Sequence, residues 1–169
     1  ETPAFVQTTL ANLKNDIDRL RDLGFKLLVI DTPPAITSTI AEVVKLADLV
    51  VIPTRPSPHD LRAVAKTVDL VEDLYKPLVF VVNAASSRAK ITTQAVIALS
   101  QHGTLSPAII HQRTDFASSM IDGRTVMEVS RGSPSAAEIT ELWKYVGERL
   151  ARTRRPLAYP MARQAVGYG

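Results

Sequence analysis

Three apolar runs in the sequence end in polar side chains that could do chemistry. These are Asp31 after the first run, Asn83 after the second, and His111-Gln112-Arg113 after the third. A carboxylate that ends a buried strand is held in a dry, fixed position, where it can orient the water shell of a Mg²⁺ ion. Asp31 is therefore a candidate metal-supporting acid, although an aspartate in this place can also cap the next turn.

The apolar pattern that surrounds these residues predicts alternating helices and strands. The expected helices span residues 8–23, 36–46, 57–75, 92–101, 115–121 and 135–152, and the expected strands span 26–31, 49–53, 78–83 and 108–110. Continuously apolar strands are typical of a parallel sheet that is buried on both faces. We therefore expect an α/β fold, a doubly wound and mostly parallel sheet with helices on both faces. In such a sheet the carboxyl ends of the strands meet at one edge, where ligands bind.

Composition and charge narrow the class of protein. The chain has 169 residues, is 46% hydrophobic and contains no cysteine, which excludes disulfides, a thiolate nucleophile and Cys-ligated zinc. From Arg149 onward there are five arginines and no acid, whereas residues 1–148 carry 15 basic and 17 acidic side chains. We expect residues 1–152 to form one domain and residues 153–169 a basic tail, which is either solvated or in contact with an anionic partner. A cytoplasmic location is expected.

Three segments carry a resemblance to a known family. They are residues 28–34 (LVIDTPP), 47–53 (ADLVVIP) and 56–61 (PSPHDL), and in their order and spacing they resemble the ParA/MinD family of deviant Walker ATPases. Within that family the small plasmid-partition ParA type is the most similar. Further segments extend the resemblance over most of the chain, namely residues 81–83, 109–113, 120–126 and 135–138.

The resemblance implies a P-loop NTPase fold and ATP hydrolysis with ATP and Mg²⁺ as cofactors. It further implies that ATP closes a homodimer and that this dimer binds nonspecific double-stranded DNA. A centromere-binding partner protein would stimulate hydrolysis, so that the protein serves DNA segregation in plasmid partition. A cytoplasmic, nucleoid-associated protein that does not bind membranes is the expectation.

The resemblance also assigns roles to the nucleotide site. Asp31 matches the Walker B acid, which is catalytic and supports Mg²⁺ through water. Thr32, Pro33 and Pro34 match the switch II region, which senses the γ-phosphate. Asn83 matches the residue that hydrogen-bonds adenine, although a turn asparagine after a strand is an equally good reading.

The loop after residue 110 and several basic residues also match family positions. His111 and Gln112 match backbone contacts to the base, although family members often have proline in place of His111. Arg88, Lys90, Arg113 and Arg124 stand where the family places DNA-contacting cations. Phosphate binding by such cations would be independent of base sequence and sensitive to salt, and ordinary surface arginines are the alternative.

The main departure from the family is the absence of a phosphate-binding loop. Family members begin with a strand and the motif K-G-G-x-G-K-[ST], but none of the seven glycines here is followed by lysine. We expect this segment to lie outside the 169 residues rather than to have been lost. The reason is that its strand belongs at the centre of the sheet beside the Asp31 strand, and an empty position there exposes two apolar edges.

Other functions remain open from the sequence. Loss of the loop would give a non-catalytic binding module of the same fold. A related ATPase of conjugative DNA transfer would have the same motifs. A membrane-cycling ATPase of the MinD type would need a C-terminal amphipathic helix, which Pro156 and Pro160 disfavour.

Overall fold

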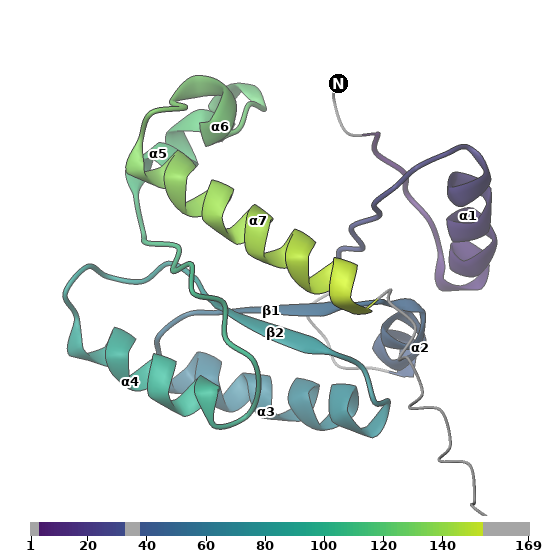
Figure 1. Cartoon of the computed structure of the whole chain (residues 1–169), viewed down its shortest axis with the longest axis horizontal. Helices are drawn as coiled ribbons and strands as arrows, with labels where there is room; N and C mark the ends of the chain where they lie inside the picture. Colours follow the sequence, from purple (N-terminus) through teal and green to yellow (C-terminus); the bar gives the residue numbers. More distant parts are fainter. Residues whose placement is uncertain (1–3, 33–37, 154–169) are drawn as a thin grey trace, which may run out of the picture.

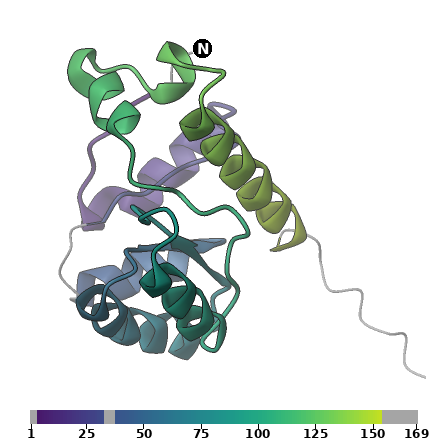
Figure 2. The same cartoon turned by 90° about the vertical axis from the view of Figure 1, so that its left-hand side faces the viewer.

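The computed structural model describes residues 4–32 and 38–153. Within these ranges the elements in chain order are α1 (Leu10–Asp22), α2 (Ser38–Leu46), β1 (Val50–Thr54), α3 (Pro58–Asp73), β2 (Leu78–Val82), α4 (Lys90–Ser100), α5 (Thr114–Ser119), the short 3₁₀ helix η1 (Met120–Asp122), α6 (Val126–Val129) and α7 (Pro134–Thr153). β1 and β2 pair in parallel. Helix α7 covers one face of this pair, while α3 and α4 cover the other (Figures 1 and 2). The expected α/β class with helices on both faces of a parallel sheet is confirmed.

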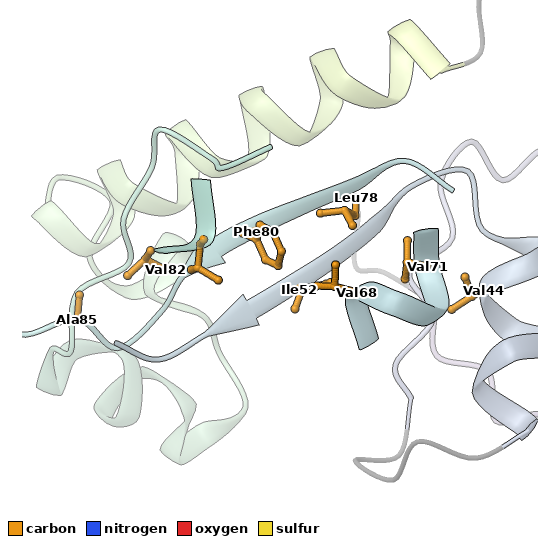
Figure 3. Close-up of a cluster of buried hydrophobic side chains, with 9 residues drawn as sticks. Val44, Ile52, Val68, Val71, Leu78, Phe80, Val82 and Ala85 are labelled. Carbon is orange, nitrogen blue, oxygen red and sulfur yellow. The ribbon is translucent and has the colours of Figure 1, made fainter. Parts of the chain in front are cut away.

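Strand β2 forms the centre of the core. All five of its residues, LVFVV, are buried. Because successive side chains of a strand point to opposite faces, β2 contributes to two apolar clusters. Phe80 joins Val71 of α3 and Leu99 of α4 in the larger cluster (Figure 3). Val79 and Val81 instead contact apolar side chains of α7, among them Leu142.

A third stretch of chain, residues 104–112, runs along the other side of β2. The amide of Phe80 donates to the carbonyl of Thr104 (2.8 Å), and the amide of Ile110 donates to the carbonyl of Val82 (2.9 Å). The expected strand 108–110 is wrong in detail, since only isolated bridges form here. The amide of Ser106 donates to the carbonyl of Phe80, and the amide of Ile110 donates to the carbonyl of Val82. Between these two bonds the stretch advances by four residues, whereas β2 advances by only two. Pro107 lies in the extra length and has no amide hydrogen to donate.

Strand β1 lies on the other side of β2 and leaves one edge open. Val50 donates its amide toward the β2 side, to the carbonyl of Pro77 (2.9 Å), and the carbonyl of Thr54 accepts from that side. The residues between, Val51 and Pro53, therefore direct their backbone polar groups to the opposite edge. Pro53 has a carbonyl but no amide hydrogen, so this open edge carries fewer donors than acceptors.

Residues 26–31 do not form the strand that their composition predicts. Val29 is 85% exposed, and Leu27 is 37% exposed. Among the described residues no backbone hydrogen bond joins this stretch to another segment. A strand needs a hydrogen-bonding neighbour, and the chain around residues 26–31 provides none, so apolarity alone is not sufficient.

The helices follow the sequence pattern closely. Ser57 is the N-cap of α3, and its hydroxyl accepts the amide of Asp60 (3.1 Å). Helix α1 ends just before Gly24, whose φ of 88° requires the conformational freedom of glycine. The expected helix 115–121 is divided between α5 and η1, and α7 continues to Thr153, one residue beyond the expected domain end.

Candidate functional site

The carboxyl ends of β1 and β2 and residues 110–112 lie side by side. The amide of Asn83 donates to the carbonyl of Thr54 (2.9 Å), and the amide of Gln112 donates to the carbonyl of Ala85 (2.9 Å). We call this region, Thr54, residues 83–85 and residues 111–113, the carboxyl edge. It brings together Asn83, His111 and Gln112, the three residues that the resemblance assigned to a base-binding site.

Asn83 uses one end of its carboxamide for the local backbone. Its Oδ1 accepts the amide of Ala84 (2.9 Å), and Ala84 has a positive φ of 51°. The turn role that the sequence suggested is therefore present. Within the described residues Nδ2 donates no hydrogen bond, and the side chain is half-buried, so this group can still donate to a ligand at the carboxyl edge.

His111 and Arg113 are both held by Glu138 in the first turns of α7. Glu138 Oε2 accepts the backbone amide of His111 (3.0 Å), and Oε1 lies 2.9 Å from His111 Nδ1. Oε1 also accepts from Arg113 through the terminal guanidinium nitrogen (2.7 Å) and Nε (3.3 Å). We call this set of hydrogen bonds the Glu138 contact. Burial alone would raise the pKa of Glu138, but donors from Arg113 and His111 outweigh burial and lower it.

Glu138 was not among the candidate site residues from the sequence. It stands on the stripe of α7 that faces the core, one turn before Leu142, and its side chain is 14% exposed. A carboxylate on an otherwise apolar stripe needs a cationic or hydrogen-bonding partner, because burying an unpaired charge is costly. That position on the stripe is the signal that could have identified it.

The four candidate DNA-binding cations fall into two groups. Arg113 contacts Glu138, and Arg124 contacts Asp122 at 2.6 Å. Hydrogen bonds to these carboxylates raise the pKa of both guanidinium groups. Arg88 and Lys90 are exposed, and in the described part of the chain neither forms an ion pair.

Among the described residues, Asp31 and Thr32 take no part in the hydrogen bonds of the carboxyl edge. Both are exposed, and they follow the unpaired stretch 26–30 rather than a strand. The dry, fixed position expected of a metal-supporting carboxylate is therefore not seen at Asp31. Pro33 and Pro34 lie outside the described residues.

A groove of about 370 Å³ separates the Asp31 segment from β1. Its walls are mostly apolar. They come from residues 25–30 and Thr32, from α1, α2 and α3, from residues 47–51 and from the second half of α7. Val51 on β1 is 41% exposed, and Trp143 on α7 is 63% exposed. The groove therefore lies along the open edge of β1, where the sequence placed a missing central strand.

The described residues alone do not provide a complete site for Mg²⁺ and ATP. No cluster of three or more His, Asp or Glu side chains suited to a metal occurs among them. Mg²⁺ in nucleotide sites is held by one or two carboxylates together with substrate phosphates, and the 169 residues contain no glycine-rich phosphate-binding loop. Asp31 fits a supporting role only where other residues hold the phosphates.

Comparison with solved structures identifies the class of fold. The chain superposes on the cell division ATPase MinD of Pyrococcus furiosus with a TM-score of 0.69 and 17% sequence identity, covering 83% of this chain and 59% of that one. The chain thus shares the fold of the part of that ATPase that it covers.

Two curated relatives carry the same description, maintenance of carboxysome distribution protein A. The one from Gloeobacter kilaueensis is 46% identical over 54 residues, which is 31% of this chain and 25% of the relative. The one from Halothiobacillus neapolitanus is 24% identical over 132 residues, 73% of this chain and 61% of the relative. The chain thus matches no more than about three fifths of the length of either relative. No protein-family model matches the chain.

Across residues 4–32 and 38–153 no helix is both long and apolar enough to span a bilayer.

Proposed function

We propose that the chain is part of a ParA-type ATPase in which ATP controls dimerisation and DNA binding. The observation that carries this proposal is the carboxyl edge, where Asn83 and residues 111–113 meet in a MinD-type fold. In a parallel α/β sheet this edge is the place where nucleotides bind. Asn83 Nδ2 and the backbone carbonyls of residues 111–112, whose amides already donate to Glu138 and Ala85, then serve as hydrogen-bonding groups for adenine.

ATP hydrolysis is proposed for the whole protein, with Asp31 as the acid that supports Mg²⁺. Turnover requires a phosphate-binding loop that the 169 residues do not contain. The strand that precedes such a loop has a suitable place in the groove, because the groove has apolar walls and borders the open edge of β1. A strand bound there would also give residues 26–31 the neighbour that they lack and would fix Asp31 at its end.

DNA binding is proposed to depend first on Arg88 and Lys90. Both are exposed at the start of α4 and have no carboxylate partner among the described residues, so their charges are available to phosphates. Arg113 and Arg124 would contribute less, since Glu138 and Asp122 already offset their charges. Nucleoid association follows from this nonspecific binding.

The cargo is proposed in two forms. Partition of a plasmid, with a centromere-binding protein as the partner that stimulates hydrolysis, follows from the motif resemblance. Distribution of a carboxysome-like cargo is the second candidate, because both curated relatives are described as carboxysome distribution proteins. The two forms share the ATP and DNA cycle and differ in the partner protein.

The enzymatic part of the proposal is tested with Asp31→Ala in the whole protein. We expect loss of Mg²⁺-dependent ATP turnover with an unchanged thermal unfolding midpoint, because an exposed carboxylate contributes little to packing. Asp69→Ala, which removes an exposed acid from α3, is the control and should retain turnover. A wild-type protein with no ATP turnover would instead favour the non-catalytic binding module.

The DNA-binding part is tested by replacing Arg88 and Lys90 together with alanine. We expect weaker binding to duplexes of all sequences and a logarithmic salt slope that is smaller by about 1.8, from two lost phosphate contacts. Replacing Arg62 and Lys66 of α3 removes the same charge from another surface and is the control. Equal effects of both pairs would show that net charge, rather than this site, governs binding.

A further inference from the structure

One carboxylate contacts both neighbours of Gln112 at the carboxyl edge, His111 and Arg113. Glu138 accepts hydrogen bonds from the backbone amide of His111 (3.0 Å) and from two guanidinium nitrogens of Arg113 (2.7 and 3.3 Å). The ring of His111 adds a further contact at 2.9 Å. Because main-chain and side-chain donors converge on this one carboxylate, Glu138 determines the path of the loop.

The backbone of His111 and Gln112 is also held by the segment that follows β2. The amide of Gln112 donates to the carbonyl of Ala85 (2.9 Å), and Ala85 and His111 form a parallel bridge. Residues 111–113 are thus fixed between the extension of β2 and the start of α7. Neither contact uses the side chain of Gln112, which is exposed.

Two kinds of residue can therefore be distinguished at the carboxyl edge: those that hold the loop and those whose side chains remain available to a ligand. His111 and Arg113 face Glu138, whereas Gln112 lies between them in sequence and its side chain stays in solvent. Asn83 directly follows the neighbouring strand β2, with Nδ2 available. A ligand that hydrogen-bonds both residues has to match a spacing that Glu138 maintains.

We propose that Glu138 is a positioning residue, which sets the backbone of residues 111–113 so that Gln112 and Asn83 select the base of a nucleotide. The inference rests on the proposed function in so far as the ligand is a nucleotide. Glu138 itself does not touch the base. It acts through His111 and Arg113, and its effect is on recognition of the base rather than on the phosphates.

The experiment compares three ligands in the whole protein: ATP, GTP and inorganic tripolyphosphate, which has the phosphates but no base. Glu138→Gln should weaken ATP binding roughly tenfold and reduce the preference for ATP over GTP, because the loop is no longer fixed. Binding of tripolyphosphate should not change. Arg113→Lys is a second variant that keeps the positive charge but loses the double contact, and it should change binding in the same direction by a smaller factor.

The control is Glu141→Gln, which neutralises an exposed acid three residues further along α7 and should leave all three affinities unchanged. Equal weakening of ATP and tripolyphosphate by Glu138→Gln, or no weakening of either, would overturn the positioning role. If Glu138→Gln does not fold, Arg113→Lys decides by the same criteria. A wild-type protein that binds ATP no better than tripolyphosphate would overturn the proposed function as well, so the two failures are distinguishable.

Discussion

Residues 78–82 and residues 27–30 have nearly the same composition, LVFVV and LLVI, but different structures. The first stretch is strand β2, with hydrogen-bonding neighbours on both sides and helices over both faces, and all of it is buried. The second forms no strand, and its Val29 is 85% exposed at the groove. The difference shows that an apolar sequence becomes a strand only where other strands satisfy its backbone.

Hydrogen exchange should show the largest difference between the two stretches. The amides of Phe80 and Ile110 donate within the sheet, so they exchange only when the core opens, and we expect protection of roughly 10³-fold or more. The amides of Leu28 and Val29 have no acceptor among the described residues and should exchange at nearly the rate of an unfolded chain. Equal protection at Val29 and Phe80 would mean that residues 26–31 are paired in solution.

Truncation of one side chain in each stretch should give the next largest difference. Phe80→Ala leaves a cavity in a fully buried cluster and should lower the free energy of unfolding by about 3–5 kcal/mol. Val29→Ala removes an exposed side chain and should change it by less than about 0.5 kcal/mol. Urea denaturation followed by circular dichroism measures both, and similar losses would contradict the comparison.

Residues 110–113, which Glu138 holds, can be compared with the exposed Asp31 by removing one carboxylate from each place and measuring the free energy of unfolding. Burial opposes ionisation of Glu138, but its hydrogen bonds lower its pKa overall, so the carboxylate stabilises the fold above its ordinary pKa. This stabilisation is lost as the pH falls through the lowered pKa. Glu138→Gln should therefore cost about 2 kcal/mol at pH 7 and progressively less in acid. Asp31→Asn removes an exposed carboxylate and should change the free energy of unfolding at pH 7 by less than about 0.5 kcal/mol. Urea denaturation measures both values, and an equal effect of the two substitutions would remove the distinction.

The smallest expected effect is that of a charge placed on the groove wall. In the 169-residue chain, Val29→Asp should change the free energy of unfolding by no more than about 0.5 kcal/mol, because position 29 faces solvent. Thermal and chemical denaturation can detect a larger change. A loss of several kcal/mol would show that something covers residues 26–31 in solution, as a strand in the groove would.

The fold was predictable where local pattern and tertiary context agree. Ser57 followed by Pro58 predicted the start of α3, and the continuous run at residues 78–82 predicted β2. The pattern failed at residues 26–31 because periodicity describes side chains and not the availability of a neighbouring strand. At residues 108–110 it failed because Pro107 and two extra residues interrupt the ladder, although the stretch does lie beside β2.

The topology predicted that Asn83 and residues 111–113 lie at one edge, but not that Asp31 follows an unpaired stretch, nor which contacts support residues 111–113. Parallel strands put Asn83 and residues 111–113 at one edge, as expected from topology. The partner of His111 and Arg113 is a glutamate 27 and 25 residues further along the chain. Nothing local to the sequence indicates which of several acids will meet these donors, because that depends on how α7 packs across the sheet.

Pro53 also influences how molecules of this protein can associate. The open edge of β1 is apolar, and edges of this kind can template the addition of further strands from other copies. At Pro53, however, an incoming strand finds a carbonyl without the amide hydrogen that would continue the ladder. Edge-to-edge pairing of β1 with the β1 of another copy is therefore interrupted after Val51. Pro53 thus disfavours edge-to-edge polymerisation. A short strand whose hydrogen bonds do not depend on that amide can still bind.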